Sequence, residues 1–243
     1  MSQQRLDKII ASQGKYSRSD VKRLARNGEI TVNGKAVSDC GMKVDPEKDS
    51  ISVCGEVFGY SRFVYIMLNK PEGVVSASRS PGEKTVVDLV PAELYRDGLF
   101  PAGRLDKDTT GFVLITDDGA FAHEILSPKK HIEKTYIAVL DRPIGEAELE
   151  KFRSGITLAD GYECLPAGIK TLTDDGLTVE IKLREGKYHQ IKRMLGVFDI
   201  GVNTLHRTHI GSLELPADLQ PGEYVKLTKE QLLQITNNMF TKS

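Results

Sequence analysis

The chain has 243 residues, of which 40% are hydrophobic and 28% charged, and its formal net charge is -1. A chain of this size buries a substantial core in one or two domains, and its near-neutral charge excludes a protein that is basic throughout. The three cysteines, Cys40, Cys54 and Cys164, lack the spacing of a disulfide framework or a zinc site, which indicates a reducing cytoplasm. The sequence shows no secretory leader and no apolar run long enough to span a membrane. We therefore expect neither secretion nor a membrane-spanning segment.

The first 36 residues carry the signals of two short helices and a hairpin. Apolar residues at helical spacing predict a helix within residues 5–13. A second helix of about three turns is predicted after Ser17, which is a good N-cap and has Asp20 three residues later. The pair Asn33-Gly34 then favours a type I′ turn between two short strands.

The second predicted helix has one basic face. Arg18, Lys22 and Arg26 fall within an arc of about 80°, while Val21 and Leu24 lie on the other side. A charged helix face is most often only solvated, but clustered cations on a compact unit also favour phosphate binding. The stretch RLDKIIASQGKYSRSDVKRLARNGEITVNGKAV resembles an S4 domain. That resemblance implies an RNA-binding module over residues 1–60.

The remainder of the chain, residues 61–243, alternates β-rich runs with a few helices. The runs FVYIML, FVLIT, KTYIAVL and LTVEIKL predict strands, and GEAELEKFRSG and TKEQLLQI predict helices. The expected fold class is therefore α/β of the α+β type, with a mixed and largely antiparallel sheet in the second domain.

The stretch GRLDKDTTGFVLITDDG places charges directly before an apolar run. The run from Phe112 to Ile115 predicts a strand that is buried on both faces, and residues 117–119 predict a turn that ends it. Asp108 is interpreted as a turn residue. By residue type alone, Asp106 fits a structural role in the loop as well as a catalytic one.

The same stretch closely resembles the active-site signature of pseudouridine synthases of the RsuA/RluA type. Three further motifs follow that family's order, namely LNKPEGVV with Lys70, EKTYIAVL with Tyr136, and REGKYHQIKRML with Lys192. The resemblance implies isomerisation of uridine to pseudouridine with Asp106 as nucleophile, without cofactor or metal. It also implies that Tyr136 stacks on the uracil and that Lys192 keeps Asp106 ionised.

The resemblance also implies contacts with RNA. Arg104 is expected to enter the space that a flipped base leaves, although a salt bridge within the loop is an alternative. In the third motif, Tyr188 is expected on an apolar helix face with Ile191 and Leu195. His206 and His209 are expected to be structural rather than metal ligands. The other expected RNA contacts are Arg18, Lys22, Arg26, Lys70, Lys129, Lys130, His189 and Arg193, with His131, Lys134, Arg207 and His209 as further phosphate contacts.

The third motif and the chain after it resemble the small-subunit branch of the family. The expected partner is 16S rRNA, free or in a partly assembled particle, and the expected protein is a cytoplasmic monomer. Three alternatives remain open at the level of sequence. They are a synthase acting on 23S rRNA, a non-catalytic S4-type RNA-binding or ribosome-assembly factor, and a hydrolase with paired carboxylates, for which we find no persuasive second carboxylate.

Overall fold

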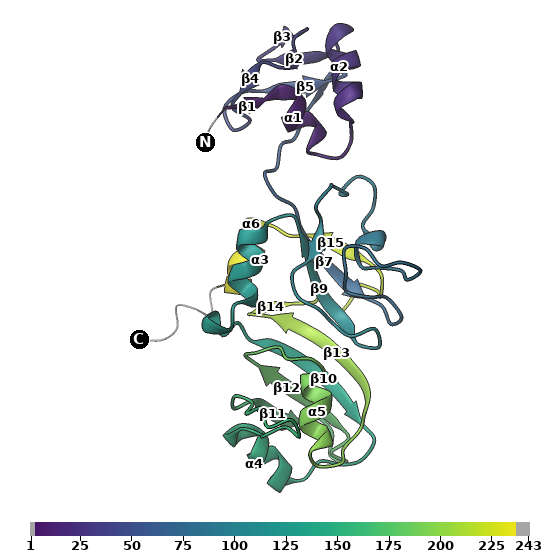
Figure 1. The fold of residues 1–243 in the computed structure, drawn as a ribbon, viewed down its shortest axis with the longest axis vertical. Coiled ribbons are helices and arrows are strands. Elements are labelled where there is room, and N and C mark those ends of the chain that lie inside the picture. Colours follow the sequence, from purple (N-terminus) through teal and green to yellow (C-terminus); the bar gives the residue numbers. More distant parts are fainter. Residues whose placement is uncertain (1–2, 237–243) are drawn as a thin grey trace. The chain divides into compact units, whose positions relative to one another are not determined.

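The computed structural model describes residues 3–236 and divides the chain into two compact units (Figure 1). The first unit contains the chain up to Val64 together with Val90–Leu99, and the second contains Tyr65–Leu89 and the chain from Phe100. The division at Val64 lies close to the expected boundary after residue 60. The return of Val90–Leu99 to the first unit is not visible in the sequence pattern, because long-range contacts alone bring it there.

The first unit is built as its sequence predicts, from two helices and short strands. The Ser17 side chain accepts a hydrogen bond from the Asp20 N–H, and the Asp20 carboxylate accepts one from the Ser17 N–H. Together they form the expected capping box. Asn33 and Gly34 have φ values of 51° and 78°, as a type I′ hairpin turn requires. The elements are β1 (Gln4–Arg5), α1 (Leu6–Ala11), α2 (Arg18–Arg26), β2 (Ile30–Val32), β3 (Lys35–Ala36), β4 (Lys43–Val44), β5 (Ile51–Val53) and β6 (Glu56–Val57).

Apolar side chains from both helices and the sheet form one core in this unit. The four-stranded sheet has the order β3-β2-β5-β6, and β1 pairs with β4. Leu6, Ile9 and Val21 are buried between the helices and these strands. Arg96 links the segment Val90–Leu99 to the rest of this unit, because its guanidinium donates to the Ser61 carbonyl and to the Gln13 side chain.

Within residues 3–236, the second unit contains a nine-stranded sheet of order β11-β12-β10-β13-β9-β7-β15, with β14 beside β13 and β8 beside β9. Every pairing is antiparallel except that of β13 with β9, so the sheet is mixed and mainly antiparallel as expected. The strands are β7 (Tyr65–Lys70), β8 (Phe100–Pro101), β9 (Thr110–Thr116), β10 (Lys134–Leu140), β11 (Gly168–Thr171), β12 (Thr178–Leu183), β13 (Val202–Ile210), β14 (Leu213–Glu214) and β15 (Tyr224–Lys226).

Strand β9 lies inside this sheet, between β7 and β13 (Figure 1). Phe112 to Ile115 are fully buried, which confirms the prediction of a strand covered on both faces. Residues 117–119 do not form a simple turn, and that prediction is wrong. Asp118 is instead the N-cap of helix α3 (Gly119–Leu126), because its carboxylate accepts hydrogen bonds from the Ala120 and Phe121 N–H groups.

Within residues 3–236, three further α-helices belong to this unit. Helices α4 (Glu146–Ser154) and α6 (Lys229–Thr236) lie where the sequence predicts them. Helix α5 (Gln190–Gly196) begins later than its motif suggests, so the expectation that Tyr188 lies on its apolar face is wrong. His189 has a left-handed backbone with φ of 49°, which stops the helix from extending back to Tyr188. Within the described residues, no helix is long and apolar enough to cross a membrane.

Candidate active site

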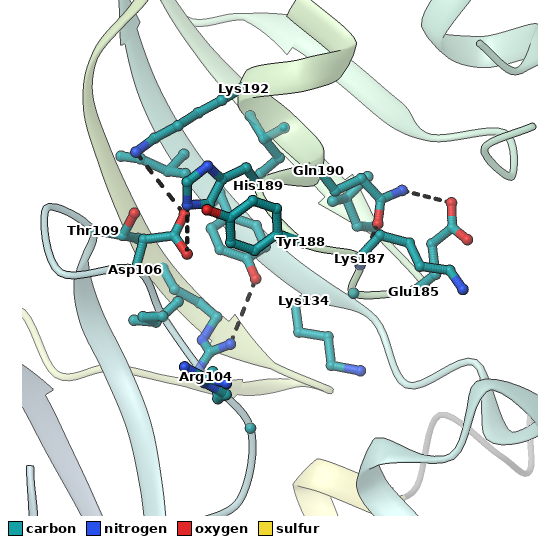
Figure 2. Close-up of a pocket in the computed structure, with 18 of the residues that line it drawn as sticks. Arg104, Asp106, Thr109, Lys134, Glu185, Lys187, Tyr188, His189, Gln190 and Lys192 are labelled. Carbon is teal, nitrogen blue, oxygen red and sulfur yellow. Dashed lines mark hydrogen bonds and ion pairs between the residues drawn. The ribbon is translucent and has the colours of Figure 1, made fainter. Parts of the chain in front are cut away.

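A pocket of about 860 Å³ opens in the second unit, where the loop before β9, strand β10 and the start of α5 meet (Figure 2). Its lining includes Arg104, Asp106, Tyr136, His189 and Lys192. These residues come from three motifs that are far apart in the sequence. The fold therefore brings together the three catalytic candidates and two of the expected RNA contacts.

The Asp106 loop is anchored on its N-terminal side by Leu105. The Leu105 side chain is buried, its N–H donates to the Ser76 hydroxyl at 3.0 Å, and its carbonyl accepts from the same hydroxyl at 2.9 Å. The Thr109 N–H then donates to the Asp106 carbonyl at 3.1 Å, which closes a tight turn. Asp106 is thus held at the edge of the pocket, with its side chain 31% exposed.

Lys70 holds the other side of this loop from strand β7. Its side chain has no exposed surface, and its ammonium group donates to the carbonyls of Pro71, Lys107 and Thr109 at 3.0, 3.2 and 2.7 Å. The expected RNA contact at Lys70 is therefore wrong, because the amine lies inside the core. Lys70 instead braces the Asp106 loop from the neighbouring strand. Burial lowers the pKa of Lys70 to about 8.

Replacing Lys70 with methionine is expected to lower the free energy of unfolding by about 3 kcal/mol or more, because three buried carbonyls lose their donor. Urea denaturation measures the effect. The difference in unfolding free energy between the native protein and Lys70→Met should grow as the pH rises from about 8 towards 10.5. In that window the unfolded chain still binds the proton that the folded lysine has released, so a rising pH favours folding.

Lys107→Met is the matched control for this substitution. Lys107 is exposed on the same loop, and its amine pairs with Glu83 at 3.0 Å. We expect its replacement to change the unfolding free energy by less than about 1 kcal/mol. Equal effects of the two substitutions would contradict the bracing role of Lys70.

Lys192 and His189 approach Asp106 from the α5 side of the pocket. The Lys192 amine lies 3.9 Å from one Asp106 oxygen, and the His189 Nε2 lies 3.4 Å from the other (Figure 2). The same lysine is closer to Asp108, with 2.7 Å to both of its oxygens. The hydrogen bond from Lys192 is the main cause of the lowered pKa of Asp108. Lys192 thus pairs with the carboxylates of both Asp106 and Asp108. From the sequence, Asp108 was interpreted only as a turn residue.

Tyr136 forms the wall of the pocket on strand β10, directly opposite Arg207 on β13. Arg207 is only 4% exposed, and its Nε donates to the Phe112 carbonyl at 2.7 Å. The guanidinium carbon lies 5.9 Å from the centre of the Tyr136 ring, and Nη1 lies 3.5 Å from the tyrosine hydroxyl. The expected phosphate contact at Arg207 is therefore wrong, because this side chain supports Tyr136 from within the protein.

The other expected RNA contacts fall into two groups. Arg104 and His131 are exposed and line the pocket, and the half-buried Lys134 lines it as well. Burial is the main cause, and the nearby Arg207 a lesser one, of a lowered pKa of about 8 at Lys134. The second group lies outside the pocket lining. It contains the exposed Lys129 and Lys130 of the 3-10 helix η2 (Pro128–Lys130), and Arg193, whose guanidinium pairs with Asp160 at 2.5 Å.

The charge arrangement does not suit an acid–base pair of carboxylates. Asp106 and Asp108 both face Lys192, and the pKa of Asp108 is lowered rather than raised. A hydrolase with paired carboxylates needs one of them protonated near neutral pH, which requires a raised pKa. The site thus offers a positioned carboxylate beside cations, next to an aromatic ring that can stack on a base.

The chain is similar to known proteins over both of its units. The family model of RNA pseudouridylate synthases matches residues 64–196, and the S4 domain model matches residues 4–50. A crystal structure of a pseudouridylate synthase superposes with a TM-score of 0.66 and 35% identity, covering 97% of this chain and 100% of that one.

Two curated bacterial relatives match along almost their whole length. The uncharacterized RNA pseudouridine synthase YtzG of Bacillus subtilis is 42% identical over 230 residues, which cover 94% of this chain and 96% of that protein. The ribosomal small subunit pseudouridine synthase A of Escherichia coli K12 is 40% identical over 233 residues, which cover 95% and 99%. On the family match and these two relatives, the chain belongs to the RNA pseudouridylate synthase family.

Proposed function

We propose that this pseudouridine synthase isomerises a single uridine of 16S rRNA in the small ribosomal subunit, at position 516. The observation that carries the proposal is the pocket in which Asp106 lies between Lys192, His189 and the Tyr136 wall. The name of the Escherichia coli relative supports the choice of the small subunit, because the similarity covers both domains.

In the proposed reaction, the bond between uracil N1 and the ribose C1′ breaks and a bond from C5 to C1′ forms. C5 loses a proton and N1 gains one, so atoms and electrons balance without an oxidant or reductant. Asp106 acts as the nucleophile, and the bond that its carboxylate forms to the nucleoside is broken again before the product leaves. The Lys192 amine stabilises the negative charge of this carboxylate. The Tyr136 ring holds the uracil against the carboxylate, supported from behind by Arg207.

The target base must leave its helical stack to reach Asp106. Arg104 is exposed at the pocket two residues before the nucleophile, where its guanidinium can enter the vacated space. We propose that the first unit holds structured RNA during this step and that the protein acts as a monomer, on free RNA or on a partly assembled particle. Cys40, Cys54 and Cys164 are free thiols, which agrees with an enzyme of the cytoplasm.

The test is to incubate the native protein with 16S rRNA, 23S rRNA and small-subunit particles, and then to map pseudouridine at nucleotide resolution. We expect one new pseudouridine in 16S rRNA at position 516. A product found only in 23S rRNA would replace the small-subunit assignment by the large-subunit one. If the protein bound RNA and left every uridine unchanged, the non-catalytic alternative would be correct.

The basic face of α2 is expected to contribute to RNA binding. Arg18, Lys22 and Arg26 are exposed, while Val21 and Leu24 pack inward. Replacing the three cations with alanine should weaken binding to 16S rRNA and reduce the slope of log affinity against log salt concentration by about 2, at about 0.7 per lost contact. Filter binding between 50 and 200 mM salt, roughly the range over which such contacts are felt, measures the slope.

The control removes the same charge from the second unit, by Lys151→Ala, Arg153→Ala and Lys170→Ala. Arg153 and Lys170 already face the carboxylates of Glu146 and Glu180 at 2.8 and 3.2 Å. Their replacement should leave the slope nearly unchanged. A slope that is the same in the native protein and the α2 variant would show that this helix face is only solvated.

A further inference from the structure

Tyr188 is an exposed aromatic ring at the edge of the pocket that the proposed chemistry does not use. Its exposed fraction is 76%, whereas the next most exposed aromatic side chain in residues 3–236 is Tyr95 at 40%. The ring stacks on His189 with 3.8 Å between ring centres and 17° between their planes. One face of Tyr188 is therefore covered by His189.

This stacked pair reaches the reacting group. His189 contacts the Asp106 carboxylate through Nε2 at 3.4 Å, and Tyr188 lies in front of the same imidazole in Figure 2. The order is thus carboxylate, imidazole, phenol ring. A base that stacks on Tyr188 would lie close to the site of reaction without occupying it.

The loop that carries the pair is fixed by a buried amide. Gln190 is buried, and its side-chain carbonyl accepts from the Lys187 N–H at 2.9 Å while its amide donates to Glu185 at 2.5 Å. Glu185 in turn accepts from the Tyr162 hydroxyl at 2.8 Å and the Leu165 N–H at 2.9 Å. The two rings are thus presented by a rigid loop, which lowers the entropy that a ligand must overcome on binding.

The charges nearby suit a nucleic acid strand rather than an apolar partner. Lys187 is exposed beside Tyr188 and lies over the Tyr162 ring at 4.6 Å from its centre. Lys192 and Arg184 also line the pocket. Exposed aromatic rings among cations are the usual means by which proteins bind single-stranded RNA, since stacking serves any base and the cations serve the backbone.

We propose that Tyr188 and His189 form a stacking platform for a nucleobase adjacent to the target uridine. When the uridine leaves the helix, its neighbour in the strand loses a stacking partner. The free face of Tyr188 replaces that partner while the uridine enters the pocket beside Asp106. This inference rests on the proposed function, because it requires an RNA strand that passes the mouth of this pocket.

The decisive experiment couples Tyr188 to one base of the RNA. Native protein, Tyr188→Leu and Tyr188→Phe are assayed on a 16S rRNA fragment that is intact or abasic at either position next to the target. We expect Tyr188→Leu to raise KM about tenfold with kcat within about twofold, and Tyr188→Phe to behave as the native protein. One abasic position should raise KM about tenfold for the native protein and less than twofold for Tyr188→Leu.

Two results would overturn the platform. One is a loss of kcat with unchanged KM in Tyr188→Leu, which would mean that the ring only positions His189 against Asp106. The other is an abasic effect of equal size in native and variant protein at both positions, which would mean that Tyr188 touches neither base. Circular dichroism of Tyr188→Leu verifies folding, which substitution of so exposed a side chain should not disturb.

A binding measurement separates this proposal from the proposed function. Fragments with 2-aminopurine on either side of the target uridine should change fluorescence on binding native protein and Tyr188→Phe, but not on binding Tyr188→Leu. The readout needs no turnover. If 23S rRNA is the only RNA modified, the small-subunit assignment fails and both measurements are made on fragments around that target. Identical fluorescence with all three proteins would overturn the platform even where pseudouridine forms.

Discussion

Asp106→Asn is expected to reduce the rate of pseudouridine formation by a factor of about 10⁴ or more, as loss of a nucleophile does in other enzymes. The amide has nearly the same shape as the carboxylate but is a far weaker nucleophile. Because the Asp106 side chain is part-exposed and its loop is held by Leu105 and Lys70, the unfolding free energy should change by less than about 1 kcal/mol. Single-turnover assays on 16S rRNA measure the rate.

Asp108→Asn is the matched control, because the two carboxylates share Lys192 and lie two residues apart. We expect at most about a tenfold loss of rate in this variant, since Lys192 remains within 3.9 Å of Asp106. The reverse ranking, with Asp108→Asn inactive and Asp106→Asn active, would identify Asp108 as the nucleophile instead of Asp106. Equal and complete loss in both would indicate that the pair acts together.

Gly111→Ala is expected to destabilise the protein by roughly 3 kcal/mol or more, because the new methyl group meets backbone on a central strand. Gly111 has a φ of +100°, and a Cβ built there would lie 2.3 Å from the Arg207 carbonyl oxygen. Gly111 pairs with Lys70 on one side and Arg207 on the other. Strands β9 and β13 would have to separate beside the Asp106 loop, so catalytic rate should fall as well. Urea denaturation and single-turnover assays measure the two effects.

Gly73→Ala separates the clash from the cost of the backbone conformation. Gly73 also has a positive φ, +81°, but a Cβ there would meet no atom within 4 Å. We expect this control to lose about 1 kcal/mol through the left-handed backbone alone. If Gly111→Ala were no more destabilising than Gly73→Ala, the close approach of β13 to Gly111 would not constrain the strand.

Local signals in the sequence predicted much of the fold. The capping box at Ser17, the Asn33-Gly34 hairpin and the buried strand from Phe112 to Ile115 are all confirmed, because each depends on neighbouring residues. The start of α3 at Asp118 was hidden, since an aspartate before glycine is equally typical of a turn. At Tyr188, helical periodicity failed because the left-handed backbone of His189 ends the helix.

In the candidate site, too, some residues were predicted correctly from the sequence and others were not. The motifs selected Asp106, Tyr136 and Lys192, and the fold brings all three to one pocket. Lys70 and Arg207 were expected to contact RNA because they are cationic, an expectation that residue type suggests for most lysines and arginines. Both are buried, where they hold the Asp106 loop and the Tyr136 ring. No local pattern could have shown that β7 and β13 pass on either side of Gly111.

The sequence by itself thus determined most of the helices and strands and the family resemblance, and it selected Asp106 as the proposed nucleophile. Capping, turns and strand periodicity act over a few residues, and the family's motifs are continuous stretches of chain. Only the tertiary structure decided what each cation does. Apart from the Pro71 carbonyl that Lys70 contacts, the partners of Lys70, Lys192 and Arg207 lie 37 to 95 residues away along the chain. A cationic side chain can bind RNA if it is exposed, whereas a buried one bonds to the nearest carbonyl or carboxylate of the protein. The burial of the side chain and its nearest partner are both set when the sheet assembles.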